Sequence, residues 1–174
     1  MGELALGMRM RDNPHMRMAV AAWLALGLLT ASVASAGTPS SGGTPTSLVI
    51  RVKSHVTSSF NDDYPPKGDS NGDRYLVRDD LINAVKQFGK RAGAVVGHDS
   101  GIIVLTGKKT GSFVGVATLP DGQIRFRGVL SLTSVPGPPL TVTGGSGRYA
   151  RASGNVVIGP GDFPLNTYRL TLPA

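Results

Sequence analysis

The feature that most constrains the fold is a succession of short runs in which apolar and polar residues alternate. The clearest two runs, Ser112–Leu119 and Gln123–Thr133, are separated by Asp121-Gly122. Alternation with a period of two is typical of a half-buried β-strand, and Asp-Gly between two such runs is a strong signal for a two-residue turn. This part of the chain is therefore expected to form an antiparallel hairpin.

Similar runs recur along the chain with turn-forming residues between them. Glycine (24) and proline (12) together account for 36 of the 174 residues, about a fifth, against about 12% in average proteins. About eight short strands separated by such turns predict an all-β sandwich or barrel. The other expected strands lie within Ser47–Val56, Asp73–Asn83, Ala94–Gly97, Gly101–Thr106, Leu140–Thr143, Asn155–Ile158 and Thr167–Leu172.

Two stretches need separate interpretation. Ser58–Gly72 is dense in turn formers and contains two adjacent prolines, so it is expected to be a long loop at one end of the fold, where loops often cover a pocket. In Asp79–Phe88 the apolar residues also have helical spacing, so a short helix competes there with a continuing strand. Gly89 and Gly93 would end such a helix.

The N-terminal region resembles a targeting segment. Three arginines precede the apolar run Met18–Leu29, and small residues ending in Ala34-Ser35-Ala36 follow it. This is the pattern of a secretory signal peptide, and the run is shorter than the roughly 20 residues of a membrane-spanning helix. We therefore expect a signal peptide over residues 1–36, a secreted product without a stable membrane span, a flexible linker over 37–46 and a folded domain over 47–174. An uncleaved anchor is the alternative.

Composition excludes several kinds of site. The chain has no cysteine, so disulfides, a thiol nucleophile and cysteine-ligated metals are excluded, and three histidines make a multi-histidine site improbable. We expect neither a metal nor a cofactor. The formal net charge is +7, but the basic residues are scattered and no run exceeds two. Such scattering favours general solubility, and a secreted location argues against nucleic acid as a partner.

A glycine-rich corner carries the most specific motif. Gly144–Gly147 is not followed by the Gly-Lys-Ser of a phosphate loop, so its glycines are expected to serve a tight turn with left-handed backbone. The surrounding segment 141–158, TVTGGSGRYARASGNVVI, resembles the signature of the allene oxide cyclase and dirigent barrel superfamily. Weaker similarity extends the resemblance over about Asp73–Leu172.

The resemblance implies an eight-stranded antiparallel β-barrel, often a homotrimer, with an apolar cavity for one small molecule. It implies an isomerase of the cyclase type, or a stereocontrol protein, acting on a reactive and largely apolar intermediate. The chain departs from the plant members: it has no cysteine, and Ser153 stands where dirigent proteins carry an arginine. Non-catalytic, lipocalin-like binding of a small apolar molecule, or a cell-surface role, is therefore the alternative.

The candidate catalytic residues are Asp79, Asp80 and Asp99. A carboxyl group in an apolar cavity has a raised pKa and can act as an acid or base; a solvated strand end is the other interpretation. His98 precedes Asp99, but adjacent residues of a strand face opposite sides and so cannot act together directly.

The candidate ligand-binding residues are Tyr75, Phe126, Arg148 and Tyr149, of which the tyrosines could equally fill the core. Strand periodicity places Ile124 and Phe126 on one face and Arg125 and Arg127 on the other. We expect the apolar face to line the interior and the arginines to point outward. If the arginines faced inward, they would hold an anionic group.

Overall fold

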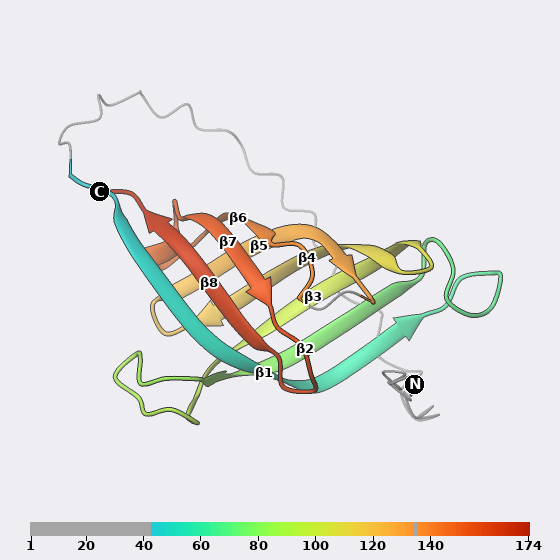
Figure 1. Ribbon diagram of the computed structural model, residues 1–174, viewed down its shortest axis with the longest axis horizontal. Coiled ribbons are helices and arrows are strands. Elements are labelled where there is room, and N and C mark those ends of the chain that lie inside the picture. The colour runs from blue at the N-terminus through green and yellow to red at the C-terminus, as the bar shows by residue number, and fades with distance from the viewer. Residues whose placement is uncertain (1–42, 134–135) are drawn as a thin grey trace, which may run out of the picture. The chain divides into compact units, whose positions relative to one another are not determined.

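The structure is a computed structural model that describes residues 43–133 and 136–174. Eight strands form a closed barrel in which each strand is antiparallel to the next and β8 pairs with β1 (Figure 1). The predicted all-β, eight-stranded antiparallel barrel is confirmed. The strands are β1 (Thr46–Asp62), β2 (Arg74–Asn83), β3 (Val95–Gly107), β4 (Thr110–Leu119), β5 (Gly122–Ser131), β6 (Leu140–Gly145), β7 (Ser153–Ile158) and β8 (Leu165–Leu172).

The expected signal peptide and the first part of the linker, up to residue 42, lie outside the described residues. Among the described residues, no helix has the length and apolar character needed to cross a membrane.

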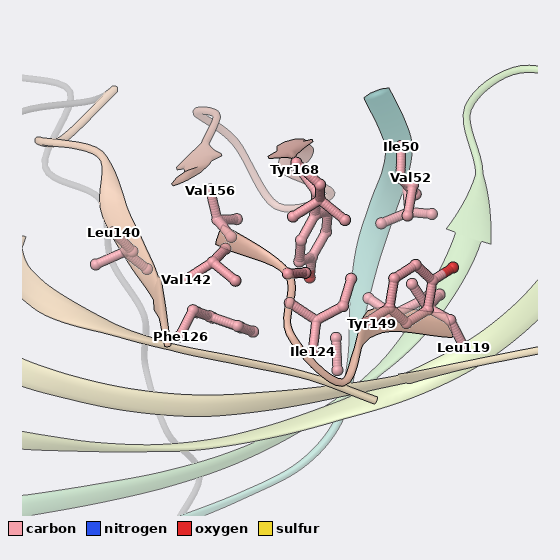
Figure 2. Packing of buried hydrophobic residues seen from close by; sticks show 14 of the residues in the cluster. Ile50, Val52, Leu119, Ile124, Phe126, Leu140, Val142, Tyr149, Val156 and Tyr168 are labelled. Atoms are coloured by element: carbon pink, nitrogen blue, oxygen red, sulfur yellow. The ribbon is translucent and has the colours of Figure 1, made fainter. Parts of the chain in front are cut away.

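The interior is built by the alternation that the sequence shows. In β5, Ile124 and Phe126 are 0% and 3% exposed, whereas Arg125 and Arg127 are exposed on the outer wall, as expected. The same alternation on all eight strands gathers one apolar core, of which Figure 2 shows the part around Phe126, Ile124 and Tyr168. Barrel closure leaves no unpaired edge along the shared length of the strands.

One local expectation was wrong in part, because the loop expected over Ser58–Gly72 begins only after Asp62. Ser58–Asp62 is not loop but the end of β1, paired with Arg74–Arg78 of β2 after a β-bulge at Thr57. The bulge adds one residue and lets the strand bend and continue, so cross-strand pairing outweighs the turn-forming composition.

Of the two interpretations of Asp79–Phe88, the continuing strand is the one observed: β2 extends to Asn83, as expected, and no helix forms there. The Asn83 side-chain amide then donates to the carbonyl oxygens of Gln87, Lys90 and Arg91. These hydrogen bonds hold the loop that follows β2. The loop is thus fixed by a polar side chain and not by the helical backbone hydrogen bonds that the apolar spacing suggested.

The glycine-rich corner leads from β6 into the short 3-10 helix η2 (Gly147–Tyr149). Gly144 and Gly147 have positive φ values of 113° and 57°, as expected for a tight turn. Gly145 is required for a different reason: a Cβ there would lie 1.8 Å from the carbonyl oxygen of Gln123. Close approach of two backbones, rather than a left-handed conformation, makes glycine necessary at this position.

The two ends of the barrel differ. β1 pairs with β8 only up to Lys53, and β5 pairs with β6 only up to Arg127, so β1 and β5 both run on beyond their pairing with the C-terminal strands (Figure 1). We call this the open end, and the end that holds η2 the closed end. Inward-facing residues toward the open end are mostly half-buried, although Leu105 and Phe113 are buried there, and those at the closed end are buried. The half-buried residues include Tyr75, Val77, Ile103 and Leu130; those at the closed end include Ile50, Leu119, Ile124 and Tyr149.

Candidate functional site

Two carboxyl groups meet inside the barrel between its two ends. Asp79 of β2 lies directly opposite Asp99 of β3 in the antiparallel ladder. Both have the inward parity of their strands, since Leu81 beside Asp79 is fully buried and Gly101 beside Asp99 is buried as well. Side chains directly opposite have Cβ atoms about 4.5–5.5 Å apart. The barrel therefore forces two acidic groups together, and we refer to them as the Asp79–Asp99 pair.

The environment of this pair favours a shared proton. Asp99 is only 7% exposed, and burial, followed by the negative charge of Asp79 and a side-chain hydrogen bond between the two groups, raises the pKa of Asp99 to about 8. Burial also raises the pKa of Asp79, although the bond from Asp99 and the charge of His55 oppose this increase. A buried and a half-buried carboxylate joined by a hydrogen bond cannot both ionise cheaply, so near neutral pH they hold one proton between them.

A third polar group belongs to the same interior. Tyr168 of β8 is 0% exposed, and its buried hydroxyl has no hydrogen-bond partner among the described residues. Burial raises its pKa well above the usual value, and the charges of Asp99 and Asp79 add to the increase. The phenol thus stays protonated and lies within the electrostatic reach of the pair.

Asn166, two residues before Tyr168 on β8, donates from its side chain to the Ser54 hydroxyl over 2.6 Å. Its own carbonyl oxygen Oδ1 is buried and has no partner among the described residues. Buried polar atoms in folded proteins are nearly always hydrogen-bonded, to protein, water or ligand. The interior therefore offers a free donor and a free acceptor on β8.

Aromatic rings cover the wall beside the pair. Phe113 and Phe126 have ring centroids 5.7 Å apart, and their rings lie where Cβ atoms of Gly101 and Gly115 would be, at 2.4–2.9 Å. Phe126 also meets the Tyr168 ring edge to face at 5.8 Å. Gly101 of β3 and Gly115 of β4 thus make room for the rings of Phe113 and Phe126, and the two tilted rings form an apolar surface next to the polar groups.

A hollow of about 430 Å³ also adjoins the Asp79–Asp99 pair, and its other lining residues are Thr57, Arg78, His98 and Ser100. Consecutive residues of a strand face opposite sides. The hollow touches neighbouring residues that face opposite sides, Arg78 with Asp79 and His98 with Asp99. It therefore lies at the barrel wall, next to Thr57 in the β1 bulge.

Other sequence-derived candidates lie elsewhere. Asp80 faces outward between His55 and His98, its cross-strand neighbours on β1 and β3. The structure thus separates the two adjacent aspartates that the sequence offered together. Tyr75 faces the interior at the open end, where its hydroxyl donates to Asp69 of the loop over 2.7 Å. This contact ties the loop between β1 and β2 to the inner wall.

Arg148 and Tyr149 lie at the closed end. Arg148 is exposed and forms an ion pair with Asp121 at 3.4 Å. Tyr149 is 0% exposed and packs in the core beside Leu119 (Figure 2). Phe126 lies beside Tyr168, closer to the polar groups. A ligand contact by any of the four candidates Tyr75, Phe126, Arg148 and Tyr149 stays a prediction.

Sequence reasoning missed Tyr168, Asn166 and Ser54. The alternation in Thr167–Leu172 does place Tyr168 on the same face as Leu170 and Leu172, which are now seen to be buried. A tyrosine in an otherwise aliphatic inward face was the available signal. In the described part of the chain, no three histidine or acidic side chains are grouped so as to hold a metal ion.

Comparisons with known proteins agree with this fold. No family model and no curated protein matches the chain, but solved structures do. A pyocyanin demethylase is 21% identical with a TM-score of 0.58, covering 71% of this chain and 100% of its own. The Diels-Alderase AbmU from Streptomyces koyangensis is 18% identical with a TM-score of 0.58, covering 76% and 70%. The pterocarpan synthase dirigent protein GePTS1 is 15% identical with a TM-score of 0.56, covering 83% and 100%.

The chain therefore has the barrel fold shared by dirigent proteins and Diels-Alderase barrels, which confirms at the level of fold the resemblance that its glycine-rich motif carries. At these identities the likeness concerns architecture, and function has to be argued from the site.

Proposed function

We propose that this protein is a small-molecule barrel of the cyclase or stereocontrol type, in which the Asp79–Asp99 pair exchanges a proton with a largely apolar ligand. The observation that carries the proposal is the placement of these two carboxyl groups opposite each other on the inner wall, beside the unpartnered Tyr168 hydroxyl. The ligand would enter from the open end and lie against the rings of Phe113 and Phe126.

The chemistry follows from the shared proton. With the pKa of Asp99 at about 8, one carboxyl group of the pair is protonated at neutral pH and can donate to an oxygen of the ligand as bonding changes. The other accepts a hydrogen bond and can take a proton later. A positioned general acid contributes about 10²–10⁴-fold to a rate, and an apolar wall that holds a reactive molecule in one conformation contributes further.

Structural neighbours support this class of function. They include a Diels-Alderase and a pterocarpan synthase dirigent protein, so barrels of this shape accommodate ring-forming and stereocontrolled reactions. An isomerase of the cyclase type is the corresponding activity for this chain.

The second candidate is non-catalytic, lipocalin-like binding, favoured by the absence of the plant proteins' cysteine and arginine. The test begins with native mass spectrometry of protein purified from its source, to identify a co-purified molecule. Its precursor is then incubated with the wild type, Asp99→Asn and the control Asp80→Asn. Loss of turnover with retained binding in Asp99→Asn alone supports catalysis. Binding without turnover by the wild type would establish the binding-only alternative.

Self-association as a homotrimer is the expected quaternary state. It is supported by a row of exposed apolar side chains on the outer wall, 41–60% exposed, which are cross-strand neighbours from β1 to β4: Phe60, Leu76, Ile102 and Val114. Contiguous exposed apolar surface marks interaction sites. Sedimentation of wild type, Ile102→Glu and the control Thr171→Glu on β8 tests this assembly. Dissociation by Ile102→Glu alone supports it, and a monomeric wild type contradicts it.

Secretion after removal of residues 1–36 completes the proposal. Trp23 is the only tryptophan of the chain, and it precedes the expected cleavage point after Ala36. Protein recovered from the secreted fraction should therefore show tyrosine emission only. Tryptophan emission from that fraction would contradict the cleavage.

A further inference from the structure

The positively charged side chains of the barrel lie on its outside. Every lysine, arginine and histidine among the described residues is exposed, and those on strands alternate with buried inward-facing residues. The interior polar face contains instead the Asp79–Asp99 pair. The sequence as a whole carries a formal charge of +7, so the inside of the barrel has the opposite sign to the molecule.

The free polar atoms of the interior specify a complementary ligand group. The Oδ1 atoms of Asp79 and Asn166 are buried acceptors without a hydrogen-bond donor among the described residues. Among the described residues two buried tyrosine hydroxyls are donors without a partner: that of Tyr168, which feels the charges of the pair, and that of Tyr149 at the closed end, which does not. A carboxylate or phosphate has acceptor atoms and negative charge, so it would leave these two acceptors unmatched and lie against the charge of the pair.

We infer that the interior selects ligands whose polar end is uncharged or cationic and donates a hydrogen bond, such as an alcohol, phenol or amine on an apolar body, and rejects carboxylates and phosphates. This inference rests on the proposed function only in assuming that the interior takes a ligand. The expected preference of the interior is opposite to that of the molecular surface, because the net positive charge of the whole molecule would attract anions to the surface. Selection against anions would therefore be a property of the interior.

Three probes on one apolar body test this selection: 2-naphthalenemethanol, 2-naphthylmethylamine and 2-naphthoate. Calorimetry at pH 7 measures each affinity, and competition for bound 2-naphthalenemethanol separates interior binding from association with the outer arginines. We expect the alcohol and the amine to bind at least tenfold more tightly than the carboxylate. The carboxylate should fail to displace the alcohol.

Variants identify the residues responsible. Asp79→Asn/Asp99→Asn, or Asp99→Asn alone if the double variant folds poorly, should weaken the amine and improve the carboxylate. Asp80→Asn is the matched control, because it removes the same charge from the outer wall, and it should leave all three affinities unchanged.

The outcomes separate the inference from the function on which it rests. If the carboxylate competes as well as the alcohol in the wild type, or if the Asp99 substitution changes nothing, the inference is wrong while the binding function stands. If none of the three probes binds the wild type, the proposed ligand-binding function itself is overturned. Preference for the amine and alcohol that is lost only in the pair variants supports the inference.

Discussion

The closed and open ends of this barrel are made of the same strands but differ in how far their inward-facing residues are buried. At the closed end, Leu119, Ile124 and Tyr149 are 0–5% exposed around the glycine corner. Toward the open end the inward-facing Tyr75, Val77 and Ile103 remain half-buried, and the Asp79–Asp99 pair lies between the two regions. The difference teaches that one end supplies stability while the other leaves inner surface accessible to solvent and to a ligand.

The largest effect expected concerns the boundary between these regions. Phe126→Ala should lower the free energy of unfolding by about 3–5 kcal/mol, because it removes a ring packed against Phe113 and Tyr168 and leaves a cavity. Denaturant unfolding measures the change. Val129→Ala, on the exposed outer face of the same strand, is the control and should change stability by less than about 0.5 kcal/mol. A larger effect of Val129→Ala than of Phe126→Ala would mean that the assigned faces of β5 are reversed.

The next effect is a pH dependence of stability, which we expect from the Asp79–Asp99 pair and not from the rest of the interior. The raised pKa of Asp99 means that the folded protein binds a proton that the unfolded chain releases near pH 4. Stability should therefore fall as the pH rises from about 4 through about 8, by up to about 1.4 kcal/mol for each pH unit.

Thermal melts between pH 5 and 9 measure this slope. The other titratable groups around the pair are His55 on β1, Arg78 and Asp80 on β2, His98 on β3 and Tyr168 on β8. Asp80→Asn is the control that should keep the slope. Asp99→Asn should flatten it. A wild type whose stability does not decline over this range would show that the pair carries no shared proton.

A smaller effect tests the closed end. Gly145→Val should destabilise by roughly 1–3 kcal/mol, because its Cβ would collide with the carbonyl oxygen of Gln123. Gly161→Val is an informative comparison, since Gly161 has φ of 93° but nothing within 4 Å of an added Cβ. An unchanged melting midpoint for Gly145→Val would contradict the close approach of the two backbones.

The smallest effect concerns the outer wall. Arg125 and Arg127 are exposed, so Arg125→Gln and Arg127→Gln should each change the unfolding free energy by less than about 0.5 kcal/mol and leave probe binding unaltered. A large loss of binding in either variant, measured with 2-naphthalenemethanol, would place an arginine in the site.

The fold could be predicted because it depends on local patterns. The alternation in Gln123–Thr133 and the Asp121-Gly122 turn define a hairpin without knowledge of the rest of the chain. The end of β1 could not be predicted in the same way, because Ser58–Asp62 forms a strand only through pairing with β2.

The candidate site could be predicted only in part. Asp79 and Asp99 were each recognisable as carboxyl groups next to apolar strand residues, but their meeting depends on the register between β2 and β3. A shift of one residue would have brought Asp80 inward instead. Tyr168 comes from the last strand and reaches the site only because the barrel closes.

The central claim, a carboxyl pair inside the barrel that shares one proton, is tested most directly by titrating the aspartate side chains. Carbon-13 NMR of protein labelled at the aspartate Cγ atoms measures each midpoint in the wild type, Asp99→Asn and the control Asp80→Asn. We predict one resonance with a midpoint near pH 8, present in the wild type and Asp80→Asn and absent from Asp99→Asn. If every aspartate of the wild type instead titrates below about pH 5, near its ordinary value, the two groups share no proton and the account of this site is contradicted.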